Sequence, residues 1–599
     1  MLSPEARRVA IDLLRSPPGH RLERAVLTTY SLDLETLLAL PLAVLAHSDG
    51  GVEDLLEDPL LLLEALREAG ERVHVFVDRA GIGIPRAPRA LYAMLERGVH
   101  PVSAPNGGAF HPKLWVARFV DADDVPLLRV AVLSRNLTDD RSWDLSLVSE
   151  ARPAPQRTFA RSRALGVLLR KLLALTDPPF PAELTEILSD LAGELERTRF
   201  PAPEGFDGDI RFHCVGLGRR RSRPWLSQPE GARLLAMAPF ASRTALDPLS
   251  GAIEGHCTLI SRQEALDGLN AQALANWDEC LVLSETAAEE ASDDTSGRPS
   301  GLHAKAVCIE RGWEATWFVG SANLTAAAFL ERNVEFMAEI SGKKGRSGGR
   351  TGCGIERFLE SGIRNLCETY RRSAPDPVEI RITAAQERLE QARTALLDAD
   401  LHVDCMLQDD AWRWTLLGEL ELPPGVELAC WPITLAEDNA RQLELPSLWK
   451  LPTSKLTAFV AFRLRIPNLL VDDLRLALKL PAEGLPEGRI NQVLRALIDS
   501  PERLLRFLRA LLGGLDALVD WSAGEGNGGT DARWGVRLGG ETLLEDLVRA
   551  ASREPSRLAP VRRLIDDLRK TEEGRRIVPD ALLALWQAVD QAAGSREVP

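Results

Sequence analysis

Two stretches of this chain repeat one pattern of polar residues, and this repeat constrains the fold more than any other feature. In each, a histidine and a lysine stand two residues apart, an apolar run follows, and Ser-x-Asn-Leu-Thr and then a carboxylate come next. The first copy holds His111, Lys113, Ser134, Asn136 and Asp144, and the second holds His303, Lys305, Ser321, Asn323 and Glu335. Because duplication of one structural unit is the economical explanation, we expect two similar halves.

The local pattern around each copy predicts strands. Residues two apart on a strand share a face, so the histidine and lysine of each copy should point the same way. The apolar runs 127–133 and 315–319, which lead into the Ser-x-Asn segments, are predicted strands. Strand-like and helical runs alternate before each copy, which favours an α/β fold, namely a duplicated α-β-α sandwich of sheets covered by helices.

The rest of the chain differs in character and suggests further domains. With 599 residues, the chain is too long for one core. Short apolar runs such as LTAFVAFRLRI predict a small β-rich domain, and the final hundred residues have a helical pattern. We expect domains at 1–200 and 201–380 for the two halves, then a β-rich domain at 381–485 and a helical domain at 486–599.

Composition limits the compartment and the partners. The eight cysteines form no CxxC pair, and no apolar run approaches the ~20 residues of a membrane span, which together favour a cytoplasmic protein. The net charge of −15 means that the molecule as a whole does not attract polyanions, so a nucleic-acid role requires a locally basic surface. The remaining histidines lack partners at ligand spacing, and we predict no metal and no cofactor.

The paired His-x-Lys and Ser-x-Asn segments resemble the phospholipase D superfamily over roughly residues 20–340. The second copy, GSANLT, is the more specific match, whereas the first has Leu133 in place of the motif glycine. The aspartate that usually stands five residues after the lysine is absent, and Arg118 and Glu310 occupy those positions. Loss of that aspartate is similar to the tyrosyl-DNA phosphodiesterase and nuclease branch of the superfamily.

The resemblance implies a metal-independent phosphodiesterase with one composite site. One imidazole would attack phosphorus and form a phosphohistidine, while the other protonates the leaving oxygen and then activates water. The resemblance assigns His111 as the nucleophile and His303 as the acid/base. The lysines, the asparagines and Ser134 and Ser321 would surround the phosphate, and a carboxylate, Asp144 or Glu335, would orient each imidazole.

Two basic loops near the motifs are candidates for phosphate binding. The first contains Arg219, Arg220, Arg221 and Arg223, and the second contains Lys343 and Lys344. Each is either a phosphate clamp or simply a solvated loop. These loops and the missing aspartate favour a nuclease, with DNA as the expected substrate.

Two other functions remain open at this point. One is a phospholipase D-type phospholipid hydrolase or transferase, and the other is a non-catalytic subunit that binds nucleic acid. By resemblance, a protein partner such as a helicase or ATPase is expected at the C-terminal region, in a bacterial DNA-processing or antiviral defence system. The sequence leaves open DNA against RNA, the strandedness of the substrate and the oligomeric state.

Overall fold

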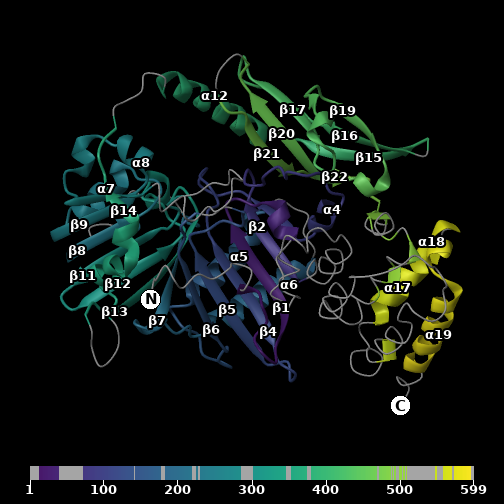
Figure 1. The fold of residues 1–599 in the computed structure, drawn as a ribbon, viewed down its shortest axis with the longest axis horizontal. Coiled ribbons are helices and arrows are strands. Elements are labelled where there is room, and N and C mark those ends of the chain that lie inside the picture. Colours follow the sequence, from purple (N-terminus) through teal and green to yellow (C-terminus); the bar gives the residue numbers. More distant parts are fainter. Residues whose placement is uncertain are drawn as a thin grey trace, which may run out of the picture.

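The structure of the protein is a computed structural model, whose arrangement is drawn in Figure 1. It describes residues 13–38, 72–139, 142–176, 182–218, 224–226, 230–284, 301–345, 352–373, 379–409, 411–467, 471–486, 547–548, 558–569 and 572–594, and single residues between 489 and 508.

The first sheet has six strands in the order β3-β2-β1-β4-β5-β6. The first three run parallel to one another, and β4, β5 and β6 are added antiparallel. The strands are β1 (Arg21–Thr29), β2 (Val73–Asp78), β3 (Val99–Val102), β4 (Leu114–Val120), β5 (Pro126–Leu133) and β6 (Ser146–Ala151). His111 and Lys113 therefore lead directly into β4, and Ser134 directly follows β5.

The second sheet repeats this arrangement. Its order is β14-β10-β9-β8-β11-β12-β13-β7, in which β8 to β13 copy the order and the directions of β1 to β6. The strands are β7 (Asp207–Val215), β8 (Gly231–Met237), β9 (Ile253–Ser261), β10 (Glu279–Leu283), β11 (Ala306–Arg311), β12 (Glu314–Gly320), β13 (Glu335–Lys343) and β14 (Cys367–Thr369). The predicted α/β fold class with a duplicated unit is confirmed.

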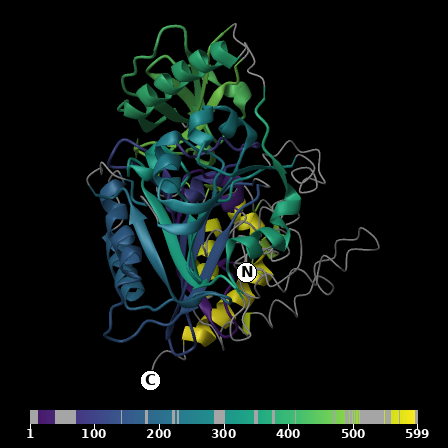
Figure 2. The same ribbon diagram turned by 90° about the vertical axis from the view of Figure 1, so that its left-hand side faces the viewer.

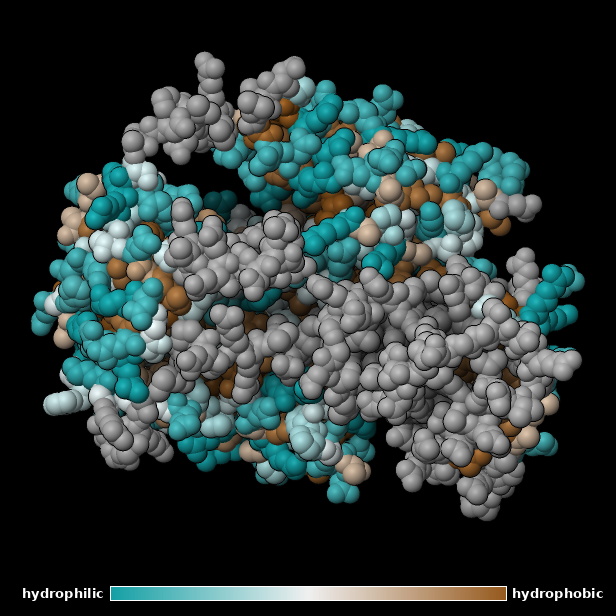
Figure 3. Space-filling view, viewed as in Figure 1, coloured by the Kyte–Doolittle hydropathy of each residue, from teal (hydrophilic) through white to brown (hydrophobic). Residues whose placement is uncertain are grey.

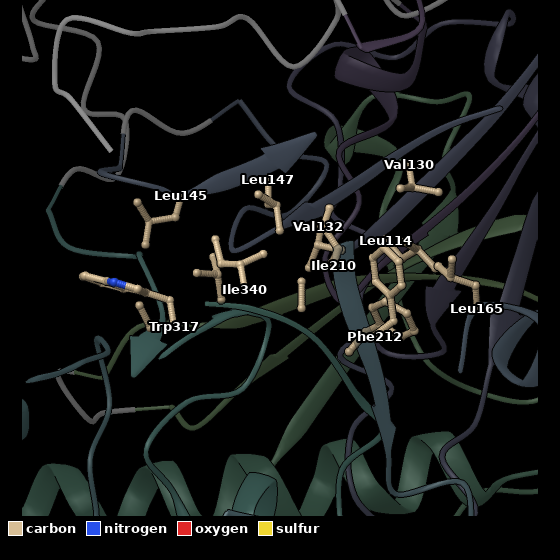
Figure 4. Close-up of a cluster of buried hydrophobic side chains, with 14 of the residues drawn as sticks. Leu114, Val130, Val132, Leu145, Leu147, Leu165, Ile210, Phe212, Trp317 and Ile340 are labelled. Carbon is tan, nitrogen blue, oxygen red and sulfur yellow. The ribbon is translucent and has the colours of Figure 1, made fainter. Parts of the chain in front are cut away.

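The two sheets share an inner apolar layer. Alternate residues of β1, β4 and β5 meet residues of β8, β11, β12 and β13 there, together with leucines of two helices, α5 (Arg163–Leu175) and α6 (Ala182–Glu196). Figure 4 shows part of this layer, with Leu114, Val130 and Val132 on one side and Trp317 and Ile340 on the other. Burial of these side chains fixes the two halves against each other.

Further helices lie on the outer faces and between the sheets. They are α4 (Tyr92–Leu95), α7 (Arg243–Ser250), α8 (Gln263–Asp267), α10 (Ala326–Phe329), α11 (Ile355–Phe358), α12 (Glu379–Asp398), α17 (Leu558–Arg569), α18 (Glu572–Ile577) and α19 (Asp580–Gly594). α7, α8 and α10 pack on the outer face of the second sheet. Residues of α17 and α19 join the apolar cluster on the outer face of the first sheet.

Two four-stranded sheets form the C-terminal β unit, which spans residues 402–483. Its strands are β15 (His402–Gln408), β16 (Ala411–Leu417), β17 (Glu427–Pro432), β18 (Arg441–Gln442), β19 (Ser447–Leu451), β20 (Phe459–Arg465), β21 (Leu474–Lys479) and β22 (Ala482–Glu483). All neighbours are antiparallel except β15 and β22. Figure 2 shows this unit, with α12, at one end of the two central sheets.

A buried polar contact fastens the C-terminal β unit to the first sheet. The Glu96 carboxylate, which is 5% exposed, accepts hydrogen bonds from Thr457 Oγ1 at 2.8 Å and from the Ala458 N–H at 3.0 Å, and it pairs with Arg489. Lys479 Nζ donates to the Val99 carbonyl at 2.8 Å. The face of the molecule seen in Figure 3 is mostly hydrophilic over this unit and over the second sheet.

Candidate active site

The two repeated motifs meet at one place, and each histidine lies against the other half of the molecule. The backbone N–H of His111 donates to the Val334 carbonyl at 2.9 Å, and the backbone N–H of His303 donates to the Trp143 carbonyl at 2.9 Å. Parallel bridges join Phe110 to Val334 and Trp143 to Leu302. Since Val334 precedes Glu335 and Trp143 precedes Asp144, each histidine is brought to the carboxylate of the opposite half.

Glu335 holds the His111 imidazole. The Nδ1 of His111 lies 2.8 Å from Glu335 Oε2, and Ser321 Oγ donates to the same oxygen. The other ring nitrogen, Nε2, lies 2.9 Å from Lys113 Nζ. An ionised carboxylate can only accept, so Nδ1 carries the proton that Glu335 accepts, and in the neutral ring Nε2 carries the lone pair.

His303 has the matching arrangement with Asp144. Its Nδ1 lies 2.9 Å from Asp144 Oδ1, to which Ser134 Oγ donates at 2.7 Å. Lys305 Nζ donates to the His303 carbonyl at 2.6 Å. The two imidazoles therefore have equivalent supports, each made of a carboxylate and a serine, and in each case the carboxylate comes from the opposite half.

Burial sets the protonation of these groups. Burial lowers the pKa of His111 to about 4, against the opposing pull of Glu335. It also lowers the pKa of His303, which the hydrogen bond to Asp144 opposes. Burial, the largest effect on Glu335, would raise its pKa, but His111, Lys113 and the hydrogen bond from Ser321 together lower it. The site is therefore prepared as neutral imidazoles beside ionised carboxylates.

Both lysines are fully buried in this cluster. Lys113 and Lys305 are 0% exposed, and burial followed by repulsion from Lys305 lowers the pKa of Lys113 well below its usual range. The negative charges of Glu335 and Asp144 oppose this lowering, so the cluster sets two buried carboxylates beside two buried lysines. A phosphodiester would add one negative charge, which favours uptake of one proton by an imidazole. We call His111, Lys113, Asp144, His303, Lys305 and Glu335 the paired-histidine cluster.

The two predicted asparagines are held by the strand ends beside the cluster. Asn136 Oδ1 accepts the Ser31 N–H at 3.4 Å. The N–H of Leu324, next to Asn323, donates to the Phe240 carbonyl at 3.1 Å. Asn323 Oδ1 is buried and has no hydrogen-bond partner among the described residues. Eight of the ten predicted catalytic residues are thus joined by contacts in one constellation, and each asparagine lies two residues after one of its serines.

Sequence reasoning missed three residues that touch this constellation. Asn333 Nδ2 donates to Glu335 Oε1 at 3.2 Å, and its position two residues before the carboxylate was the only available signal. The Tyr30 ring lies 5.2 Å from the His111 ring, measured between centroids. Arg393 of α12 interacts electrostatically with Tyr30 and pairs with Glu390 at 2.6 Å. No local pattern could have predicted that α12, more than 280 residues after His111, reaches this place.

The two lysines of the second basic loop are not brought to the cluster. Lys343 and Lys344 lie at the opposite end of β13 from Glu335, about 26 Å away at ~3.3 Å per strand residue. Lys343 pairs with Glu314 at 3.0 Å, and Lys344 lies over the Trp313 ring at 5.9 Å. Their predicted role in substrate binding has no support from this geometry. Arg219, Arg220, Arg221 and Arg223 lie outside the described residues.

The residues that stand in place of the missing aspartates have structural roles. Arg118 pairs with Glu194 at 2.8 Å, away from the histidines. Glu310 Oε1 accepts the Ile355 N–H at 2.7 Å, at the start of α11. Within the described ranges, no three His, Cys, Asp or Glu side chains gather as a metal site would require, and no helix there is long and apolar enough to cross a membrane.

Comparison with known proteins yields distant structural similarity. No protein-family model and no curated protein sequence matches this chain. Solved structures of yeast tyrosyl-DNA phosphodiesterase are similar to this one. One of them is 12% identical to this chain with a TM-score of 0.34, and the match covers 57% of this chain and 87% of the yeast chain. A variant of the same yeast enzyme is 11% identical, with a TM-score of 0.36, and covers 58% of this chain and 88% of that chain. Similarity this distant carries no argument about activity or substrate. Arguments about activity rest on the geometry of the paired-histidine cluster.

Proposed function

We propose that the protein is a metal-independent phosphodiesterase that cleaves nucleic acid, with DNA as the first substrate to test. The observation that carries the proposal is the pair of imidazoles, each with Nδ1 held by a buried carboxylate of the opposite half. Two fully buried lysines stand beside them. This set supplies a nucleophile, an acid/base and fixed positive charge for phosphoryl transfer.

In the first step, Nε2 of His111 attacks phosphorus and a nitrogen–phosphorus bond forms. The bond from phosphorus to the leaving oxygen breaks, and Nε2 of His303 gives its proton to that oxygen. Lys113 Nζ, which is 2.9 Å from Nε2 in the free protein, must then turn to a phosphoryl oxygen. In the second step, His303 takes a proton from water, the resulting hydroxide attacks phosphorus, and the nitrogen–phosphorus bond breaks.

The assignment of His111 as nucleophile is part of the proposal and has its own support. His111 has the pKa of about 4, so it is neutral and nucleophilic over the physiological range. The N–H of Phe110, next to it, is held by Asp78 Oδ2 at 2.7 Å, which fixes the attacking residue.

The test is cleavage of labelled single-stranded and double-stranded DNA in EDTA. We compare the wild type with His111→Ala, with His303→Ala and with His213→Ala, a histidine outside the cluster. We expect multiple-turnover cleavage by the wild type and by His213→Ala alone. With ³²P-labelled substrate, His303→Ala should accumulate an acid-labile protein adduct that His111→Ala never forms. Cleavage that survives both cluster substitutions would overturn the proposal, and wild-type activity on phospholipid vesicles but not on DNA would favour the lipid alternative.

A further inference from the structure

One strand position differs in charge between the two halves. By register, Asp78, the last residue of β2, is equivalent to Arg262, the first residue after β9. Asp78 accepts the N–H of Phe110, which precedes His111, at 2.7 Å. Arg262 Nε donates to the carbonyl of Leu302, which precedes His303, at 2.7 Å. The same register position is therefore acidic in the first half and basic in the second.

The Arg262 guanidinium is anchored but not neutralised. The Leu302 carbonyl fixes it through Nε, beside His303. Among the described residues, no carboxylate lies within ion-pair distance of it, in contrast to Arg118 or Arg364. A guanidinium that is held by one nitrogen and keeps its Nη groups uncommitted is suited to bind a phosphate oxygen.

Phe240 stands next to this guanidinium and faces solvent. It is 51% exposed, and the Arg262 guanidinium carbon lies 5.7 Å from its ring centroid. Its backbone is fixed, because its carbonyl accepts the Leu324 N–H at 3.1 Å and Ala241 forms a bridge with Leu324. Single exposed aromatics are common on protein surfaces. Phe240 differs from them in its two neighbours. Its backbone contacts Leu324, the residue after Asn323, and its ring lies beside Arg262.

We propose that Phe240 and Arg262 form a subsite for a nucleobase and its phosphate, next to the scissile phosphodiester. This subsite rests on the proposed function and specifies its substrate class: a single-stranded or frayed strand whose base can stack on Phe240. Stacking on an aromatic ring tolerates every base, and a cationic partner holds the adjoining phosphate. A phospholipid would offer neither a flat ring for Phe240 nor a second phosphate for Arg262.

The subsite exists on one side of the pseudo-twofold only. Leu32 forms a bridge with Leu137 in the first half, and Ala241 forms the equivalent bridge with Leu324 in the second. Ser31, which precedes Leu32, is therefore equivalent to Phe240, which precedes Ala241. With Ser31 and Asp78 at one edge and Phe240 and Arg262 at the other, a bound strand has a defined direction across two imidazoles that are otherwise alike. The base that stacks lies on the His303 side.

The test is binding rather than turnover, so it does not depend on catalysis. In the His111→Ala background, which lacks the attacking imidazole and forms no covalent adduct, fluorescence anisotropy measures the affinity of a labelled 12-nucleotide single strand and of a 12-residue strand in which every nucleotide is abasic. Phe240→Ala should weaken binding of the normal strand about 5- to 150-fold and leave binding of the abasic strand unchanged. Arg262→Ala should weaken binding of both strands. Trp313→Ala is the matched control, because Trp313 is 78% exposed beside a cation, Lys344, but lies at the far end of β11.

Equal losses on the normal and abasic strands with Phe240→Ala would overturn the subsite, as would a loss of the same size with Trp313→Ala. Since Phe240 is half exposed, its truncation should not prevent folding, and Phe240→Trp should restore base-dependent binding. If the wild type cleaves no strand while the base-dependent contrast persists, the proposed chemistry fails and the subsite stands. If the wild type cleaves but the contrast is missing, the subsite alone fails.

Discussion

Glu335→Gln is the substitution that tests the paired-histidine cluster most directly. The Glu335 carboxylate accepts three hydrogen bonds, from His111 Nδ1, Ser321 Oγ and Asn333 Nδ2. Glutamine keeps the shape of the side chain but provides one accepting oxygen and one donating nitrogen. It cannot accept on both sides, so each of its two orientations fails in a different way.

If the glutamine oxygen faces His111, its NH₂ meets the Asn333 NH₂, and one charge-assisted hydrogen bond becomes a neutral one. That difference is worth about 1–2 kcal/mol, or roughly a 10-fold loss. If the NH₂ faces His111 instead, the proton must move from Nδ1 to Nε2, and the nucleophilic lone pair is lost. The wrong tautomer in a serine protease triad lowers kcat about 10⁴-fold. We therefore expect Glu335→Gln to lower the single-turnover cleavage rate about 10- to 10⁴-fold, according to the orientation that the amide adopts.

Glu339→Gln is the matched control. Glu339 lies four residues further along the same strand, and its Oε2 pairs with His213 Nε2 at 2.7 Å, so it forms a similar carboxylate–imidazole pair outside the cluster. The cleavage rate of Glu339→Gln should stay within about 3-fold of the wild-type rate. Single-turnover rates and thermal melts are measured on both variants, because loss of a buried carboxylate beside buried lysines costs about 3–5 kcal/mol of stability.

A folded Glu335→Gln protein that cleaves within about 3-fold of the wild-type rate would refute the tautomer argument. If that variant proves unfolded at the assay temperature, Asn333→Ala serves instead. It removes the hydrogen bond to Glu335 Oε1 and the one that Asn333 Oδ1 accepts from the Ala109 backbone N–H at 3.0 Å, and we expect a loss of at least about 2- to 13-fold, the equivalent of one ordinary hydrogen bond. No loss with Asn333→Ala would show that the support of Glu335 is irrelevant to the rate.

Four further outcomes are expected. The value of kcat/KM should be maximal between about pH 4 and 6.5. His111, whose pKa is about 4, must be neutral, and His303, whose pKa is lowered from 6.5, must be protonated. A maximum at pH 8 would contradict this. The free energy of unfolding should fall as pH drops from 6.5 to 4. Burial lowers the pKa of His74 to about 4, so in this range His74 takes a proton only when the protein is unfolded. His74→Gln should therefore reduce the difference in unfolding free energy that urea titrations measure between pH 7 and pH 4.5. Asp144→Asn should lower the cleavage rate as strongly as Glu335→Gln does. EDTA should leave the wild-type rate unchanged, and a loss that Mg²⁺ restores would refute a metal-free mechanism.

Some of the fold could be predicted from local pattern. The apolar runs around 24–32, 72–78 and 256–262 became β1, β2 and β9, because strand periodicity and β-branched residues are properties of the sequence itself. The helical pattern at 384–399 became part of α12. The register of the strands, by contrast, depends on partners that lie far away in the chain.

The sequence by itself determined the chemical inventory: two histidines, two lysines, two serines, two asparagines and two carboxylates in a repeated order. It could not say which carboxylate serves which histidine, because spacing along the chain treats the two copies alike. The tertiary structure decided this through the bridges Phe110–Val334 and Trp143–Leu302, which exchange the carboxylates between the halves. It also placed Arg393 beside Tyr30 and set Arg262 at the register position of Asp78. Contacts of this kind depend on how two sheets bury their shared apolar face, and that packing involves the whole chain at once.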